Sequence, residues 1–185
     1  MSDACLQAMA TPVMTARGAE FRKVMANLNS GLRYAFDLSP SKPEMKTHSW
    51  TGEDGYRVVV VSGSGTAAME MVIANRFRNN DLVLVPTNGK FGERVADICR
   101  QFCNVKQLQY EWGRSFDLYE LEQQLERGCY EALLICHNET SSGITQDAEA
   151  IAEMCERHDV SFILDGITSV GGMPVHPAKW KAEAV

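Results

Sequence analysis

Short apolar runs alternate with amphipathic segments from residue 57 to residue 165, and this alternation is the feature that most restricts the fold. The apolar runs have the length of strands, and the segments between them carry apolar residues at helical spacing. Strands joined through helices are parallel and covered on both faces, so the sequence predicts an α/β fold with a mostly parallel sheet and helices on both faces. We expect strands at 57–62, 82–85, 105–109, 132–136 and 161–164, and helices at 66–78, 91–102, 118–127 and 147–158.

The alternation also indicates how the chain is divided. Residues 56–185 are expected to form a large ligand-binding domain, and residues 1–55 a separate N-terminal segment. Apolar residues at helical spacing predict a helix at 19–28, and the proline-rich stretch at 39–43 predicts a break in regular structure.

The composition excludes several classes of function. Lys and Arg number 18 and Asp and Glu number 24, which gives a formal net charge of −6 without a dense basic run. Nucleic acid is therefore not an expected partner, because binding a phosphate backbone requires basic surface. No apolar run approaches the roughly 18 residues of a membrane helix, and the N-terminus lacks the pattern of a secretory signal. We expect a cytoplasmic protein that does not contact membranes.

The six cysteines and four histidines do not predict a metal site. No two cysteines have C-x-x-C spacing, and the histidines are scattered. Cys99 and Cys103 lie four residues apart on a predicted helix, so a metal pair is conceivable. The preferred interpretation is two small buried side chains in a reduced protein, with no metal.

Ligands bind at the carboxyl ends of the strands in a parallel sheet, so the loops after the predicted strands are the places to look. The first loop, Ser-Gly-Ser-Gly-Thr at 62–66, leads from a strand into a helix. The N–H groups at a helix N-terminus favour an anion such as phosphate, and Ser64 and Thr66 add hydroxyl groups. The loop is neither a Walker loop nor G-x-G-x-x-G. A plain turn with a Ser or Thr cap is the alternative.

The next two loops carry an aromatic ring and a polar cluster. Phe91 stands between glycines after the strand at 82–85, where it could lie against a planar ligand or begin the core face of its helix. Six polar side chains then follow the strand at 132–136, in the stretch 137–143. Polar groups are costly to bury without partners, so this cluster indicates either a ligand with hydrogen-bonding edges or a solvated turn.

Asp165 directly follows the last predicted strand. A carboxylate in that position is partly desolvated and needs a cation or hydrogen-bond donors to stay ionised. A metal, an arginine or a protonated ring nitrogen could serve, and a simple helix cap is the alternative.

A single ligand with a phosphate, a flat ring, a ring hydroxyl and a basic ring nitrogen would use all four loops. Pyridoxal 5′-phosphate has these parts, so it is the expected cofactor.

The same four loops resemble those of the class V aminotransferases, in particular the branch of alanine–glyoxylate, serine–pyruvate and 2-aminoethylphosphonate–pyruvate transaminases. The resemblance runs from about residue 58 to residue 180. It rests on SGSGTAAME at 62–70, NGKFGER at 88–94, HNETSSG at 137–143 and DGITSVGG at 165–172.

The resemblance implies a role for each matching residue. Ser64, Gly65 and Thr66 would bind the cofactor phosphate, and Phe91 would stack on the pyridine ring. Thr140 would form a hydrogen bond near the phenolic oxygen of the ring. Asp165 would pair with the protonated ring nitrogen, which makes it the expected catalytic residue.

The resemblance also implies an activity that this stretch of sequence does not complete. The expected function is transfer of an amino group from a small amino acid to pyruvate or glyoxylate, by a protein that is a homodimer. The Ser-x-Gln-Lys-like stretch with the family's Schiff-base lysine is not found, so residues 56–185 are expected to be an incomplete large domain. Two alternatives stay open: a non-catalytic module of the same fold that binds the cofactor or forms a dimer, and a domain that binds another phosphorylated ligand.

Overall fold

The computed structural model describes residues 2–40 and 52–185. The chain separates into two compact units, one formed by Met1–Tyr34 with Ser39–Val58 and the other by Ala35–Leu38 with Val59–Val185.

The first unit contains the helices α1 (Asp3–Met9) and α2 (Ala19–Ala35). The predicted helix at 19–28 is therefore present but extends further than the sequence indicated. Its last turn carries Arg33, which is buried and binds both carboxylate oxygens of Asp54, at 2.7 and 2.8 Å. Burial opposes the charged form of Asp54, yet hydrogen bonds from Arg33 and Ser39 hold its pKa below the usual value. The ion pair between Arg33 and Asp54 therefore holds the last turn of α2 against the residues that precede the second unit in the chain.

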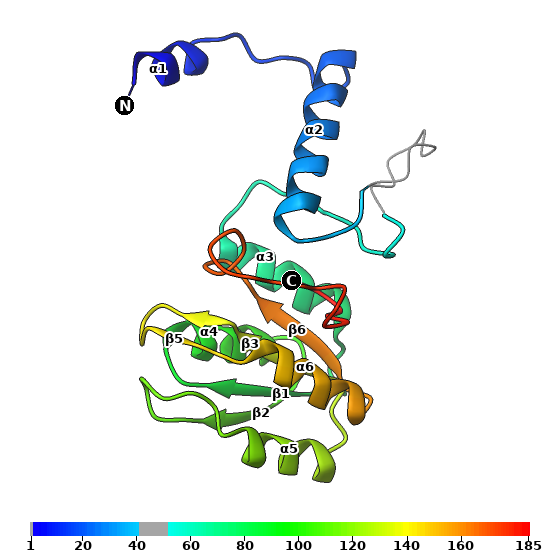
Figure 1. Cartoon of the computed structure of the whole chain (residues 1–185), viewed down its shortest axis with the longest axis vertical. Helices are drawn as coiled ribbons and strands as arrows, with labels where there is room; N and C mark the ends of the chain where they lie inside the picture. The colour runs from blue at the N-terminus through cyan, green and yellow to red at the C-terminus, as the bar shows by residue number, and fades with distance from the viewer. Residues whose placement is uncertain (1, 41–51) are drawn as a thin grey trace. The chain divides into compact units, whose positions relative to one another are not determined.

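The second unit is built on a parallel sheet with the strand order β2-β1-β3-β6 (Figure 1). The strands are β1 (Leu82–Thr87), β2 (Asn104–Gln109), β3 (Ala132–Cys136) and β6 (Ser161–Asp165). A short antiparallel pair, β4 (Asn138–Glu139) and β5 (Ile144–Thr145), follows β3. The predicted α/β class and parallel sheet are confirmed.

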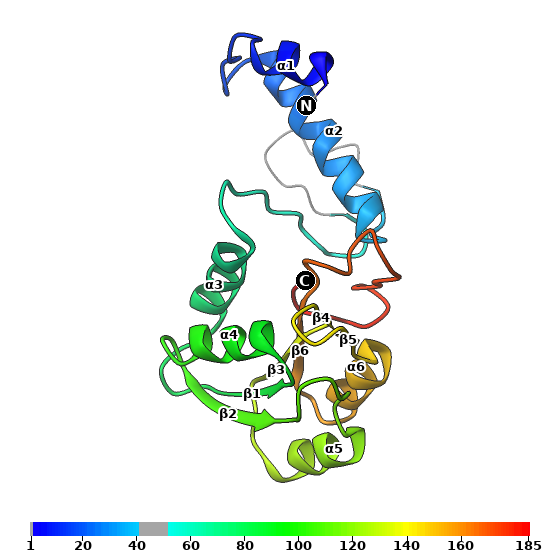
Figure 2. The same cartoon turned by 90° about the vertical axis from the view of Figure 1, so that its left-hand side faces the viewer.

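Two helices cover each face of this sheet, as Figure 2 shows for α3 and α4 on one side and α5 on the other. Because side chains alternate along a strand, each strand contributes apolar residues to both faces. In β1, Leu84 packs on the side of α5 and α6, whereas Val83 and Val85 pack on the side of α3 and α4. The helices are α3 (Gly65–Arg76), α4 (Lys90–Cys99), α5 (Leu118–Arg127) and α6 (Ala148–Arg157).

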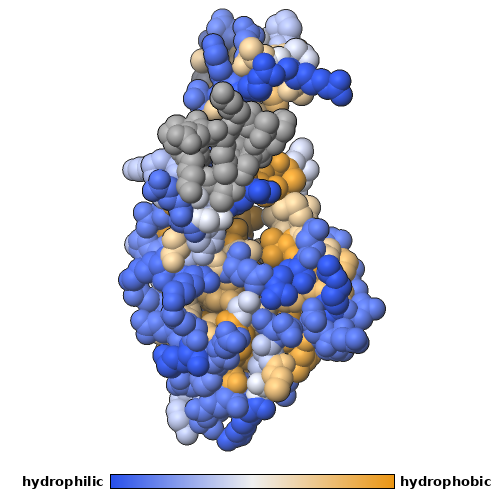
Figure 3. Space-filling model, turned by 90° about the vertical axis from the view of Figure 1, so that its right-hand side faces the viewer, coloured by the Kyte–Doolittle hydropathy of each residue, from blue (hydrophilic) through white to orange (hydrophobic). Residues whose placement is uncertain are grey.

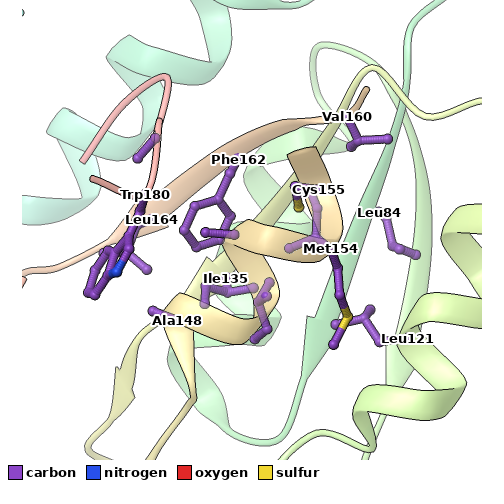
Figure 4. Close-up of a cluster of buried hydrophobic side chains, with 14 of the residues drawn as sticks. Leu84, Leu121, Ile135, Ala148, Met154, Cys155, Val160, Phe162, Leu164 and Trp180 are labelled. Carbon is purple, nitrogen blue, oxygen red and sulfur yellow. The ribbon is translucent and has the colours of Figure 1, made fainter. Parts of the chain in front are cut away.

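The larger apolar cluster lies between the sheet and the pair α5 and α6 (Figure 4). Ile135 and Phe162 contribute from the strands, and Met154 of α6 points toward Leu121 of α5. On the opposite face, Cys99 and Cys103 are buried free thiols, and burial raises the pKa of Cys99 to about 12. The interpretation of these cysteines as small core side chains is confirmed.

The strand order reverses between β1 and β3. The chain leaves β1 through α4 to reach β2 on one side, and it reaches β3 on the other side of β1 through α5. The loops after β1 and β3 therefore turn toward opposite faces and separate at the carboxyl edge of the sheet. Such a reversal is where parallel sheets bind their ligands.

The predicted strand at 57–62 is wrong. Residues 58–61 form no strand, and Val59, Val60 and Val61 are all exposed. A strand needs a neighbour to pair its backbone groups. Since β2 and β6 form the edges of the four-stranded sheet, none of its strands pairs with this segment in the described part of the chain. A run of valines indicates strand propensity but cannot show whether a partner strand exists.

Apolar side chains are exposed elsewhere as well, and Figure 3 shows orange apolar patches among the hydrophilic surface on one face. No helix among the described residues has the length and apolar character needed to cross a membrane. Exposed large apolar residues are Leu6, Met9, Val13, Met14, Val24, Leu28, Tyr34, Val59, Val60, Val61, Trp112, Tyr119 and Ile167.

The burial difference between two valines gives a test of this fold. Val83→Ala removes two fully buried methyl groups and should lower the free energy of unfolding by about 2 kcal/mol. Val59→Ala removes the same atoms from a side chain that is 60% exposed, and should change stability by less than about 0.5 kcal/mol. Denaturant titration of both variants measures the difference, and equal losses would show that 58–61 is a buried strand after all.

Candidate active site

The candidate site lies at the carboxyl edge of the sheet, on the side covered by α3 and α4. Strand alternation determines this side: Ile163 packs toward α3 and α4, so Asp165, two residues later, projects in the same direction. Asp165 lies beside Cys136 in the β3–β6 register, and its carbonyl oxygen accepts a hydrogen bond from the His137 N–H at 3.0 Å. The strand therefore fixes the Asp165 backbone at the sheet edge.

The carboxylate of Asp165 is only half satisfied. Its Oδ1 accepts a hydrogen bond from the Ile167 N–H at 3.1 Å. Its Oδ2 is buried and has no hydrogen-bond partner within the described residues. Burial raises the pKa of Asp165, and the negative charge of Glu139 adds to this, while the Ile167 N–H and Arg94 act in the opposite direction. A buried acceptor without a donor is the kind of group that a cationic ligand satisfies.

The N-terminus of α3 begins close to the loop that follows Asp165. Ser64 caps α3 through its own side chain, whose Oγ accepts a hydrogen bond from the Ala67 N–H at 3.2 Å. Among the described residues, no acceptor is bound to the N–H groups of Gly65 or Thr66. A Cβ on Gly65 would stand 2.1 Å from the Ile167 side chain, so the glycine allows this close approach. Ser64 therefore forms the cap that was the alternative interpretation of this loop, while the N–H groups of Gly65 and Thr66 remain without an acceptor among the described residues.

Arg94 connects three of the predicted site residues, although the sequence analysis gave it no role. Its Nη1 donates a hydrogen bond to Thr66 Oγ1 at 3.3 Å, and its guanidinium carbon lies 5.2 Å from the centroid of the Phe91 ring. Its charge also acts on the Asp165 carboxylate. Arg94 therefore contacts Thr66 and Phe91 directly and acts on Asp165 through its charge. The spacing of Phe91 and Arg94 by three residues on one helix was a signal that the sequence already contained.

Glu139 is the second residue that the sequence analysis missed. Its side chain is fully buried, and it accepts hydrogen bonds from the N–H groups of Phe91 at 3.0 Å and Gly92 at 2.8 Å. The N–H and hydroxyl groups of Ser141 bind its other oxygen at 3.1 and 2.6 Å. The polar stretch at 137–143 was expected to need partners, and for Glu139 the partner is the N-terminus of α4.

Thr140 is exposed at the same edge, directly after Glu139. The strand ends on either side are joined by Asn138 and Thr168, since the Asn138 amide donates to Thr168 Oγ1 at 3.1 Å and Thr168 Oγ1 donates to the Asn138 carbonyl at 2.9 Å. His137 lies on the opposite side of the sheet, with its ring edge-on to Trp180 at 5.8 Å. Burial lowers the pKa of His137.

Residues 10–185 match the family profile described as aminotransferase class V. The chain belongs to the class V aminotransferase family. Class V aminotransferases depend on pyridoxal 5′-phosphate, so the predicted fold, family and cofactor class agree with this match.

Relatives of known name belong to the same family. The chain is 28% identical over 180 residues to the (S)-ureidoglycine–glyoxylate transaminase of Bacillus subtilis. The aligned region covers 97% of this chain and 40% of that protein. It is 34% identical over 158 residues to the alanine–glyoxylate aminotransferase of Rattus norvegicus, and this aligned region covers 85% of this chain and 34% of that protein. The chain thus spans less than half the length of these relatives.

A solved structure shows the same fold. The alanine–glyoxylate aminotransferase of Nostoc sp. superimposes with a TM-score of 0.83 at 31% identity, over 99% of this chain and 45% of that one. The large-domain architecture of class V aminotransferases is therefore present in these residues.

The chain's own residues fit a pyridoxal phosphate group. The unpartnered Oδ2 of Asp165 suits the protonated ring nitrogen, and the free N–H groups of Gly65 and Thr66 suit the phosphate. Among residues 2–40 and 52–185, no three His, Cys, Asp or Glu side chains are placed to hold a metal ion.

The half-satisfied carboxylate gives a stability test in the ligand-free protein. The pKa of Asp165 is raised in the folded state, so the acid favours folding only while it is protonated, and this contribution is lost as the pH rises through the folded-state pKa. Asp165→Asn keeps the Oδ1 acceptor without the charge. We expect the variant to unfold at higher denaturant than the wild type at neutral pH, with the difference vanishing as the pH falls toward 3.8, the ordinary pKa of the group.

Asp117→Asn is the matched control for this measurement. Asp117 caps α5 by accepting a hydrogen bond from the Glu120 N–H at 3.1 Å, and it is exposed. Asn is an equally good cap, so the control should change stability by less than about 0.5 kcal/mol. If Asp165→Asn is destabilising at neutral pH, the carboxylate is not under the strain that its burial indicates.

Proposed function

We propose that this chain is the cofactor-binding part of a pyridoxal-phosphate-dependent transaminase that transfers an amino group from a small amino acid to pyruvate or glyoxylate. The single observation that carries the proposal is the buried, unpartnered Oδ2 of Asp165 at the sheet edge where the strand order reverses. In the proposed protein, residues 56–185 form the cofactor-binding domain and residues 1–55 the N-terminal segment.

The proposed roles of the site residues follow from their positions. The N–H groups of Gly65 and Thr66, with the hydroxyl groups of Ser64 and Thr66, bind the phosphate at the positive end of α3. Phe91 contacts the face of the pyridine ring. Thr140 provides a hydrogen bond to the ring oxygen.

Asp165 is the proposed catalytic residue. Its Oδ2 accepts the hydrogen bond of the ring N–H, and the positive charge of the ring stabilises the carboxylate in its ionised form. Bound pyridoxal phosphate supplies an electron sink that makes removal of a proton from the substrate α-carbon feasible. The protein's contribution at Asp165 is to keep the ring nitrogen protonated, so that the sink stays electron-poor.

The names of the relatives support the choice of acceptor. The Bacillus subtilis and Rattus norvegicus relatives are both named for transfer to glyoxylate. The choice between glyoxylate and pyruvate, and the identity of the donor, stay part of the proposal.

A non-catalytic role for the module is the alternative. Lys179 and Lys181 do not decide between the two functions, because both form exposed ion pairs with α6: Lys179 with Glu149 at 2.5 Å, and Lys181 with Glu156. Neither supplies an amino group to the cofactor site. In this alternative the chain binds the cofactor or forms a dimer without turnover.

We further propose a cytoplasmic homodimer. The apolar side chains of Val24 and Leu28 on α2, which are 47% and 39% exposed, are available for contact with a second copy. Light scattering of the purified protein measures the oligomeric state directly.

Cofactor binding is the first test of the proposal. Pyridoxamine 5′-phosphate is the probe, because it has the ring and phosphate but no aldehyde that could react with surface lysines. We expect the wild-type chain, as part of the complete protein that contains this sequence, to bind it in a tryptophan-fluorescence titration. Asp165→Asn should raise the dissociation constant by about tenfold or more, since a charge-assisted hydrogen bond is lost.

Two outcomes separate the candidate functions. Asp117→Asn, on α5 and so on the face of the sheet opposite to α3 and α4, should bind the probe like the wild type. If Thr66→Ala leaves the affinity unchanged, the N-terminus of α3 serves another phosphorylated ligand. If the wild-type chain does not bind the probe at all, the proposed function is wrong.

Amino transfer is the second test, made on the protein encoded by the complete reading frame that contains this sequence. With L-alanine or L-serine as donor and glyoxylate as acceptor, we expect glycine to form only when pyridoxal phosphate is present. The same protein with Asp165→Ala should lose at least about a hundredfold in kcat/KM, with folding checked by circular dichroism. Binding of the cofactor without any amino transfer would favour the non-catalytic alternative.

A further inference from the structure

The N-terminus of α4 is capped by another part of the chain. Gly89 precedes the helix and provides no side-chain cap. The N–H of Lys90 binds Ser141 Oγ at 2.8 Å, and the N–H groups of Phe91 and Gly92 bind Glu139 Oε2 at 3.0 and 2.8 Å. The first three donors of α4 are thus all satisfied by the turn that follows β3. This helix end is therefore filled by protein groups, unlike the N-terminus of α3.

Glu139 joins the two loops that separate at the strand-order reversal. One carboxylate oxygen binds α4, which follows β1, and the other binds the N–H and hydroxyl of Ser141, which follows β3. Both oxygens accept two hydrogen bonds, so the side chain has one favoured position. The positive end of the α4 dipole also stabilises the buried negative charge.

The backbone at Gly89 leaves space for the Glu139 side chain. A Cβ on Gly89 would stand 2.4 and 2.5 Å from Cγ and Cδ of Glu139, and 2.6 Å from Ser141 Oγ. Only glycine therefore allows the carboxylate to approach the helix end so closely.

The residues on either side of this contact are those proposed to hold the cofactor ring. Phe91 donates its own N–H to Glu139, and Thr140 is the next residue in the chain after Glu139. The negative charge of Glu139 also acts on Asp165, where it adds to the effect of burial. No atom of Glu139 needs to touch the cofactor for its position to matter, because it fixes the backbone at Phe91 and next to Thr140, which are both proposed to contact the ring.

We propose that Glu139 is a positioning residue, which holds Phe91 and Thr140 in register with each other so that the cofactor ring is bound in one orientation. The inference rests on the proposed function, because it assigns Glu139 a part in binding the same cofactor. It goes beyond that function because neither the fold nor the family match gives the residue a role.

The test compares charge removal at two helix ends. Glu139→Gln keeps the shape of the side chain but leaves one acceptor oxygen in place of two and removes the charge. Asp117→Asn makes the same chemical change at the N-terminus of α5 and is the matched control. The cofactor-free form of the complete protein that contains this sequence is purified as wild type and as each variant and titrated with pyridoxamine 5′-phosphate, and the induced circular dichroism of the bound probe is recorded at saturation.

We expect Glu139→Gln to raise the dissociation constant of the probe by about tenfold or more, the loss typical of hydrogen bonds to a charged group. The induced circular dichroism per bound probe should also fall, because the ring is no longer held in one orientation. This second readout would not change if Glu139 only stabilised the fold. Asp117→Asn should match the wild type in both measurements.

Ser141→Ala gives a milder variant in case Glu139→Gln does not fold. It removes the hydroxyl that binds Glu139 and caps Lys90, but leaves the contacts of Glu139 with Phe91 and Gly92. We expect a rise of about threefold to fivefold in the dissociation constant, smaller than for Glu139→Gln because the carboxylate keeps its contacts with α4, together with a smaller induced signal.

The inference and the proposed function fail in different ways. A wild-type chain that does not bind the probe refutes the proposed function, and the role of Glu139 with it. A wild-type chain that binds the probe refutes the inference alone if a folded Glu139→Gln, or Ser141→Ala where the former is unfolded, retains wild-type affinity and wild-type circular dichroism.

Discussion

The reversal of strand order between β1 and β3 is the constraint on which the site depends. Parallel strands place all their carboxyl ends at one edge, and the reversal sends the following loops to opposite faces, which opens the edge to a ligand. Four hydrogen bonds to Glu139 then link these diverging loops again at a single buried carboxylate. A site that is open to a ligand and also fixed in shape requires both features.

Two carboxylates at this edge of the sheet differ in how many hydrogen bonds they accept. Glu139 has its hydrogen-bonding capacity filled by the backbone and by Ser141, whereas Asp165 keeps one buried oxygen without a partner. A filled carboxylate is a rigid part of the framework, and an unfilled one is a binding group that costs stability until a ligand arrives. The N–H groups of Gly65 and Thr66 on α3, which have no acceptor among the described residues, and the filled N–H groups of α4 show the same division for backbone donors.

The sequence predicted most of the second unit because local pattern and tertiary structure agree there. The predicted strand at 132–136 and helix at 118–127 match β3 and α5. The prediction failed at 57–62, where four valines indicate a strand but the described chain offers no neighbour to pair with it. The length of α2 was also underestimated, since its last turn is held by the pairing of Arg33 with Asp54, 21 residues further along the chain. Pairing between distant residues does not appear in local periodicity.

The sequence by itself determined the α/β class and the loops that form the candidate site, because both follow from residue types at fixed spacing along the chain, and its motifs resembled those of the family. The tertiary structure decided which of those side chains meet. It placed Arg94 between Thr66 and Phe91, left Asp165 Oδ2 without a donor, and buried Glu139 against a helix end 47 residues away in the sequence. The physical reason is that hydrogen bonding and burial depend on neighbours in space, which only the folded sheet brings together.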